Sequence, residues 1–293
     1  MNDQGSEKTG SASRPLGSPP KAAEEAARRR IDDLIGEAKT RSFVGPWTLF
    51  YKEILRFALI AWQTVVSPVV TTMLYFLVFG YSLGDRLQEV QGVVYVDFLV
   101  PGLVMLALIT NAYINSAFSL FIAKIHGTII DLLVTPLTYI EFLTSYVSAA
   151  LVRAMLIGGI IWVVALLMGS QAWYNVPVAL LFMVLTALVF SFIGLIIAIV
   201  GEDFDHINLL PSFLITPLTF LGGVFYSIEM LPAPWDTVSL FNPILYMVNG
   251  VRYGMVGVTD VPVWHGLLLL AVMNIIFGGL ALWLLKTGKK IRE

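Results

Sequence analysis

Apolar segments about as long as a bilayer is thick alternate with short polar stretches from Phe57 to Leu285. A helix rises 1.5 Å per residue, so about 20 apolar residues cross the roughly 30 Å hydrocarbon core of a membrane. The pattern predicts six membrane-spanning helices, at residues 57–80, 98–123, 144–169, 176–200, 209–226 and 267–285. Pro68 is expected to kink the first of them. We therefore expect an all-α polytopic membrane protein.

The basic residues predict how these spans are oriented, because Lys and Arg are enriched in short cytoplasmic loops. Basic side chains precede the first span, follow the second and follow the sixth: Arg41, Lys52 and Arg56, then Lys124, then Lys286, Lys289, Lys290 and Arg292. The opposite side holds Arg86 and Arg252. Acidic residues count little in this rule, so the acidic loop 201–208 does not alter the prediction. Both termini are expected in the cytoplasm.

The first 42 residues differ from the rest of the chain. They are rich in Ser, Gly, Pro and charged residues, which predicts a disordered, charged cytoplasmic tail with a short helix at 22–39. No apolar region begins the chain, so no cleaved signal peptide is expected. Residues 43–293 are expected to form one membrane domain.

Three segments do not fit a membrane span. Residues 45–57 mix aromatic and basic residues at helical spacing, which favours an interfacial helix over a simple start of the first span. Residues 124–141 form a short amphipathic segment that Pro136 ends, suited either to docking a cytoplasmic partner or to lying on the membrane surface. Residues 227–263 are expected outside, with 240–256 as a re-entrant or interfacial element near a translocation path.

The composition excludes several function classes. Charged residues make up 13% of the chain, against about 25% in soluble domains, and there is no basic domain to bind nucleic acid. There is no cysteine, which excludes disulfides and thiolate catalysis. No Walker A motif or metal-binding histidine spacing occurs. The G-x-S-x-G match at Gly80–Gly84 follows a membrane span rather than a strand, so we interpret it as a loop.

Charges within the predicted spans are rare and therefore informative. Arg153 is the main one, and we expect its guanidinium to reach the cytoplasmic interface by snorkelling rather than to act inside the membrane. Glu202 and Asp203, with Arg153, carry the alternative hypothesis of a self-sufficient proton-coupled transporter. The near absence of other ionisable groups weighs against it. Small residues at every fourth position, in 150–158 and 250–254, predict close helix packing.

Several strings resemble one known family: VPGLVM at 100–105, TNAY at 110–113, LITPLTFLGGVFYS at 214–227, NPILYM at 242–247 and GVRYG at 250–254. The layout of residues 43–293 resembles the ABC-2 family, the permeases of type 2 ABC exporters, in its YadH-like branch. The resemblance implies six spans with an N-terminal interfacial helix, a cytoplasmic coupling helix and outer re-entrant helices between spans five and six. It also implies a multi-pass inner-membrane protein that forms a homodimer.

The same resemblance implies partners and roles. Two copies of a separate ABC ATPase would bind ATP and Mg²⁺, and this chain itself would bind no cofactor. Contact with the ATPase falls on Lys124, His126, Asp131, Leu132, Leu133 and Pro136. Candidate pathway-lining residues are Asn111, Tyr113, Asn115, Ser116, Ser212 and Phe213. The outer re-entrant element holds Asn242, Pro243, Tyr246 and Arg252. The cargo, whether lipid-like, drug-like or glycan, is left open.

Overall fold

The computed structural model describes residues 44–59, 61–82, 84, 88–129, 135 and 137–288. The predicted tail at 1–42 lies outside the described residues, as do Asp131, Leu132, Leu133 and Pro136. The long helices are α2 (Val44–Leu59), α3 (Ala61–Ser82), α4 (Tyr95–Ile125), α6 (Tyr139–Leu167), α7 (Val176–Val200) and α12 (Val263–Thr287). The fold is mostly helical, as the sequence predicts.

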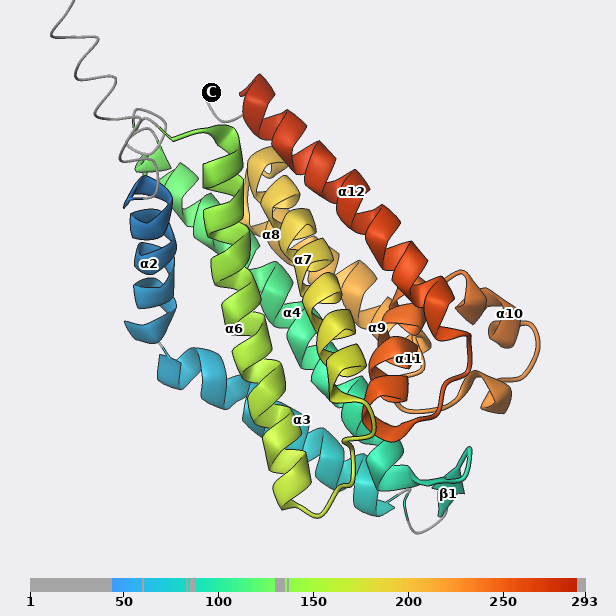
Figure 1. The fold of residues 1–293 in the computed structure, drawn as a ribbon. Coiled ribbons are helices and arrows are strands. Elements are labelled where there is room, and N and C mark those ends of the chain that lie inside the picture. Colours follow the sequence, from blue (N-terminus) through green and yellow to red (C-terminus); the bar gives the residue numbers. More distant parts are fainter. Residues whose placement is uncertain are drawn as a thin grey trace, which may run out of the picture. The chain divides into compact units, whose positions relative to one another are not determined.

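Four helices are each long and apolar enough to cross a membrane: α4, α6, α7 and α12. They match the predicted second, third, fourth and sixth spans, and α7 has the predicted bounds. Figure 1 shows α4, α6 and α7 side by side, with α12 crossing the outer face of α7. The four helices differ in how far they are buried within the protein. In α4, 78% of the most apolar segment is buried, whereas in α12 the buried share of the corresponding segment is 11%. The central helix is therefore α4.

The predicted interfacial helix and the predicted first span correspond to two helices, α2 and α3. The chain bends by 60° between α2 and α3, which together pass the same test of length and apolarity. A helix separate from the span is thus present at the predicted place. Its exposed face is apolar and its buried face carries a carboxylate, Glu53. The exposed side chains, four residues apart, are Trp47, Tyr51, Leu55 and Leu59. Such a face is suited to lipid contact.

The predicted fifth span is also composite. It comprises α8 (Phe204–Leu210), the π-helical turn η1 (Pro211–Ile215) and α9 (Thr216–Leu221). The junction residues keep right-handed helical angles, so the helical path is continuous. It begins inside the stretch 201–208 that we predicted as a loop and ends before the predicted end at Tyr226. The acidic residue Asp205 lies in the first turn, where it is favourable to the helix dipole.

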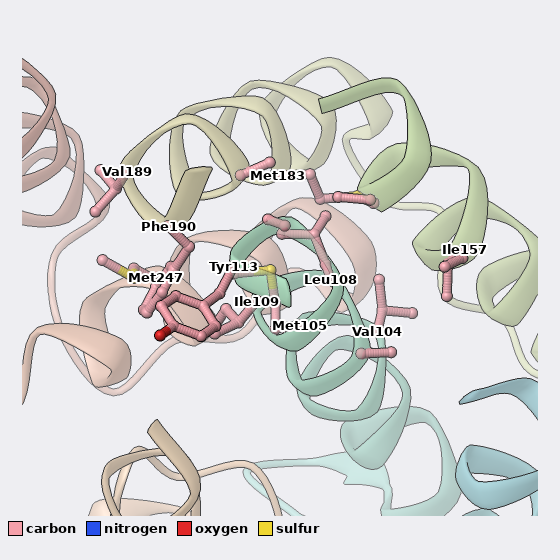
Figure 2. Packing of buried hydrophobic residues seen from close by; sticks show 14 of the residues in the cluster. Val104, Met105, Leu108, Ile109, Tyr113, Ile157, Met183, Val189, Phe190 and Met247 are labelled. Carbon is pink, nitrogen blue, oxygen red and sulfur yellow. The ribbon is translucent and has the colours of Figure 1, made fainter. Parts of the chain in front are cut away.

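The hydrophobic core lies where α4, α6, α7 and α11 (Pro243–Val256) meet. Figure 2 shows α4 residues such as Leu108 and Tyr113 packed against α6 and α7 residues and against Met247 of α11. Glycines permit the closest approaches. A Cβ on Gly194 of α7 would lie 2.6 Å from the Tyr113 carbonyl oxygen of α4. The predicted packing motif at Gly250 and Gly254 is used within the chain, against Phe182 and Ala179 of α7.

Residues 126–138 connect α4 and α6 at one end of the helix bundle. The other end carries several short elements. A hairpin of β1 (Glu89–Val90) and β2 (Val93–Val94) turns at Gln91 and Gly92, both with positive φ. This is the φ pattern of the tight hairpin turns that match strand twist. Beyond α9 come η2 (Ile228–Met230), α10 (Trp235–Leu240) and α11. The hairpin was not predicted, whereas a short element was predicted at 240–256, where α11 lies.

Thr138 begins α6 with a capping box that the apolar pattern did not reveal. Its hydroxyl accepts from the Glu141 amide, and the Glu141 carboxylate accepts from the Thr138 amide at 2.8 Å. We expect Thr138→Ala to destabilise the start of α6 by about 1 kcal/mol. Hydrogen exchange of amides 139–143 should rise, while Thr144→Ala, outside the cap, should leave it unchanged. Equal exchange in both variants would refute the role of the cap.

Candidate functional site

The C-terminal ends of α4 and α7 are joined by one of the predicted coupling residues. The Lys124 ammonium donates to the carbonyl oxygens of Ile199 and Gly201, at 3.0 Å each. These carbonyls end α7, where a cation is favourable to the helix dipole. His126 ends α4 and is exposed. The Lys124 side chain thus holds the end of α4 to the end of α7, next to the exposed His126.

A second polar group, here called the inner polar cluster, joins α2 to α4 and α6. Its members are Glu53, Arg56, Asn111, Asn115, Ser119 and Arg153. The Glu53 carboxylate accepts from the Arg56 Nε at 3.0 Å and from the Ser119 hydroxyl. Asn115 Oδ1 accepts from both Arg56 and Arg153, at 3.2 and 3.1 Å. Glu53 is almost fully buried. The cluster therefore fixes α2 to the bundle through charged groups.

The placement of Arg153 corrects the sequence prediction. Its side chain is only 7% exposed, and its guanidinium bonds to Asn115 and, at 3.4 Å, to Asn111. The snorkelling prediction was wrong because α4 offers amide oxygens beside α6, within the protein. Two of the candidate lining residues, Asn111 and Asn115, are thus partners of a buried arginine.

A third group, here called the outer polar cluster after the orientation predicted from the sequence, surrounds Arg252 on α11. Its members are Gln91, Ser227, Asn249, Arg252 and Asp260. Arg252 is fully buried and lies 3.4 Å from the Asp260 carboxylate. It also donates to the Gly223 carbonyl oxygen and stands over the Phe98 ring, 3.8 Å from its centroid. Arg252 therefore ties α11 to the start of α4 and to the turn after α9.

The remaining contacts extend this cluster to the hairpin. Gln91 donates to Asp260 at 2.6 Å and to Ser227 at 3.1 Å, and Asn249 accepts from the Asp260 amide at 2.9 Å. Burial lowers the pKa of the Arg252 guanidinium to about 10, while Asp260 opposes that shift. The guanidinium is still cationic at neutral pH. The cluster is thus a buried ion pair that gathers four separate outer segments.

The other residues predicted for the outer re-entrant element begin α11 or hold it to neighbouring helices. Asn242 caps α11 by accepting from the Ile244 amide at 3.0 Å, and it donates to the Leu218 carbonyl oxygen of α9 at 2.6 Å. Pro243 occupies the first turn, which suits its fixed φ. The Tyr246 hydroxyl donates to the Leu240 carbonyl oxygen at 2.9 Å and holds α10 to α11.

The other candidate lining residues are split between two environments. Tyr113 and Ser116 are fully buried, and both hydroxyls donate to carbonyl oxygens of the same chain. Ser212 and Phe213, on η1, are exposed, with Phe213 at 75%. The six residues therefore do not form one surface within a single chain.

Sequence reasoning missed several residues that hold these clusters. Glu53 was considered only as one of the charged residues in the predicted interfacial helix, and Asp260, Gln91, Ser227 and Ser119 were given no role. One signal was present, since Asp260 follows Arg252 by eight residues at the edge of an apolar stretch. Among the described residues, no group of three or more His, Asp or Glu side chains could hold a metal ion.

Comparison with known proteins gives the family. Residues 46–256 match the model of the ABC-2 type transporter family. The chain is 40% identical to the inner membrane transport permease YadH of Escherichia coli strain K12 over 246 residues, which cover 84% of this chain and 96% of that protein. It is 27% identical to nodulation protein J of Rhizobium leguminosarum biovar trifolii over 205 residues, covering 68% and 78%. The chain belongs to the ABC-2 type transporter family.

Proposed function

We propose that this protein is the permease subunit of an ABC exporter in the inner membrane, where it moves a lipid-like, drug-like or glycan cargo outward. The match to the ABC-2 family over residues 46–256 carries the proposal, together with the resemblance to a permease named for the inner membrane. Two copies would form the permease, and two separate ATPase subunits would drive it. A family permease carries no ATPase chemistry of its own.

The permease has six spans in this proposal. Four are α4, α6, α7 and α12. We assign the first to α3, with α2 as the interfacial helix before it, and the fifth to the continuous path from α8 to α9, which is 18 residues or about 27 Å long. The short helices α10 and α11 then lie on the outer side as the re-entrant element. The burial of α11 against α4 and α7 supports this place, because irregular backbone at membrane depth needs a protein environment.

Coupling to the ATPase is assigned to the segment between α4 and α6, which includes Asp131, Leu132, Leu133 and Pro136. Two described features support this assignment. Lys124 fixes the end of α4 to the end of α7, and the Thr138 cap fixes the start of α6. A displacement of the intervening segment by the ATPase would therefore be transmitted to α4, α6 and α7 together. The exposed His126 is the described residue that we expect to contact the ATPase.

The second copy is expected against the exposed apolar face of the composite fifth span. This face carries Leu209, Phe213, Leu214 and Phe220, each at least 40% exposed. Ser212 lies beside them, and η1 is a π-helical turn, a feature that often marks functional sites. We assign the lining of the pathway to Ser212 and Phe213, since Tyr113 and Ser116 are occupied within their own chain.

Single cysteines test this function cleanly, because the natural chain has none. We expect a membrane-impermeant maleimide to label Trp264→Cys in intact cells but to label His126→Cys only after the membrane is opened. A thiol-reactive crosslinker should then capture a Walker-motif ATPase from His126→Cys and not from Trp264→Cys. Capture from neither position, with both cysteines reactive, would contradict the assigned coupling contact. Labelling of His126→Cys from outside would contradict the orientation.

A further inference from the structure

The inner polar cluster holds more positive than negative charge. Arg56 pairs with the one carboxylate, Glu53, which Lys52 directly precedes in the chain, and Arg153 lies beside Arg56 at the Asn115 amide oxygen. Glu53 is already used by Arg56 at 3.0 Å and by Lys52 at 3.7 Å. Within the described part of the chain, Arg153 forms no ion pair with a carboxylate. An excess of positive charge thus lies beside helices that cross the membrane.

Arg153 is the least compensated of these cations. It shares the Asn115 amide oxygen with Arg56, so a neutral atom stands between two guanidinium groups. Its Nε has no hydrogen-bond partner among the described residues, although the side chain is 93% buried. Burying a charge without an opposite charge is costly, and two like charges at one oxygen add repulsion. An acidic group at this point would lower both the cost of the uncompensated charge and the repulsion between the two guanidinium groups.

A second unpartnered donor lies on the same face of α6. Tyr146 is almost fully buried, and its hydroxyl has no partner among the described residues. It precedes Arg153 by seven residues, which is close to two full turns of a helix. Arg56 is 29% exposed on the side chain, so the cluster is not closed to its surroundings. The residues therefore offer unsatisfied donors and a partly open cation.

An apolar pocket lies farther along the same two helices. It is lined by Val69, Thr72, Met73 and Phe76 of α3, Val100 and Leu103 of α4, Ile161, Val164 and Ala165 of α6, and Met168 directly after α6. Val100 is 11 residues from Asn111, and Val164 is 11 residues from Arg153. Eleven residues are three turns, so the pocket shares the helix faces of the cluster and lies about 16 Å farther toward the outer side.

We propose that the seam between α2–α3 and α4–α6 binds an amphipathic anion. Its phosphate or carboxylate group would bind Arg56 and Arg153, since a guanidinium matches these oxyanions. Its acyl chain would run toward the apolar pocket. The bound anion would then have its head group toward the cytoplasm and its acyl chain toward the membrane centre, which is the orientation of a lipid in the inner leaflet. The proposal does not depend on the transport function: the anion is either a resident phospholipid or a lipid-like cargo.

Asn115→Asp is the sharpest variant, because it places a carboxylate between the two guanidinium groups without changing side-chain size. We expect this variant to fold at least as stably as the natural protein and to lose the anion. Native mass spectrometry of the full-length protein, titrated with phosphatidylglycerol, should show an apparent affinity at least about tenfold weaker in the variant. Phosphatidylcholine should bind both forms equally.

Three further variants check the assignment. Arg153→Gln should weaken binding of phosphatidylglycerol as Asn115→Asp does, and Glu53→Gln should strengthen it, because it removes the competing carboxylate. Lys286→Gln, an exposed cation at the end of α12, should leave binding unchanged. Equal binding of phosphatidylglycerol by the natural protein and by Asn115→Asp, with both folded, would overturn the proposal.

The source of the anion is identified by what co-purifies. Lipid extraction of the natural protein should release an amphipathic anion that is absent from Asn115→Asp. A membrane phospholipid identifies a resident lipid, and any other amphipathic anion identifies a cargo. Inorganic phosphate alone should not raise the melting temperature of the natural protein, because it lacks the chain that the pocket would hold. Stabilisation by inorganic phosphate equal to that by phosphatidylglycerol would refute a lipid-type ligand.

Discussion

Replacing Asp260 with asparagine is expected to destabilise the protein by about 3 to 5 kcal/mol. The reason is the burial of its partner, since Arg252 is 0% exposed and the Asp260 side chain only 2%. Without the carboxylate, a guanidinium is left inside the protein with no opposite charge. Asp260 Oδ1 also accepts from Gln91 and Ser227, so an asparagine that keeps these two bonds would turn its NH2 donor toward Arg252.

Thermal unfolding in detergent, followed by size-exclusion chromatography with fluorescence detection, would measure this loss. Glu229→Gln is the matched control, because it also removes an outer carboxylate but one that is exposed. A double variant, Arg252→Met with Asp260→Asn, should be less destabilised than the sum of the two single variants. An unchanged melting temperature in Asp260→Asn would show that the pair does not hold the outer segments.

Gly254→Val is the second change from which we expect a large effect. A Cβ at this position would lie 2.4 Å from the backbone nitrogen and 2.7 Å from the Cα of Ala179. These are backbone atoms of α7, which cannot rotate away as a side chain would. The helices α11 and α7 would have to separate, and we expect a loss of about 3 kcal/mol. Since α11 positions Arg252, the outer polar cluster would be disturbed as well.

Gly279→Val on α12 supplies the control for this overpacking. A Cβ at Gly279 meets no atom within 4 Å, so the added side chain has room. Valine also forms helices somewhat better than glycine, so this variant should be as stable as the natural protein or slightly more so. The same thermal measurement applies to both. Equal melting temperatures for Gly254→Val and Gly279→Val would contradict the close packing of α11 on α7.

The sequence was most informative about the long helices. Each combines about 20 apolar residues with flanking polar groups, which few other structures can satisfy in a membrane. Its errors lie at the ends, where polar residues continue a helix. The third span was predicted to start at Thr144, because the apolar count begins there, yet α6 starts at Tyr139 behind the Thr138 cap. For the same reason the acidic stretch 201–208 was predicted as a loop, although α8 begins within it at Phe204.

The sequence was least informative about which helix face points inward. A membrane helix is apolar on all sides, so its hydrophobic pattern does not distinguish protein from lipid. Asn111 and Phe213 were therefore both assigned to a pathway, whereas the structure buries the first and exposes the second. Arg153 was misread because its partners, Asn111 and Asn115, lie about 40 residues earlier on another helix. Such pairings depend on tertiary contacts that no local pattern contains.

The measurement that tests the central claim most directly is affinity purification of the tagged protein from gently solubilised native membranes, followed by quantitative mass spectrometry. We expect recovery of a Walker-motif ATPase in a one-to-one ratio with this chain, as a complex with two copies of each would give. Recovery of the folded protein without any ATPase, even after crosslinking through His126→Cys, would contradict the exporter assignment and favour a transporter driven by an ion gradient.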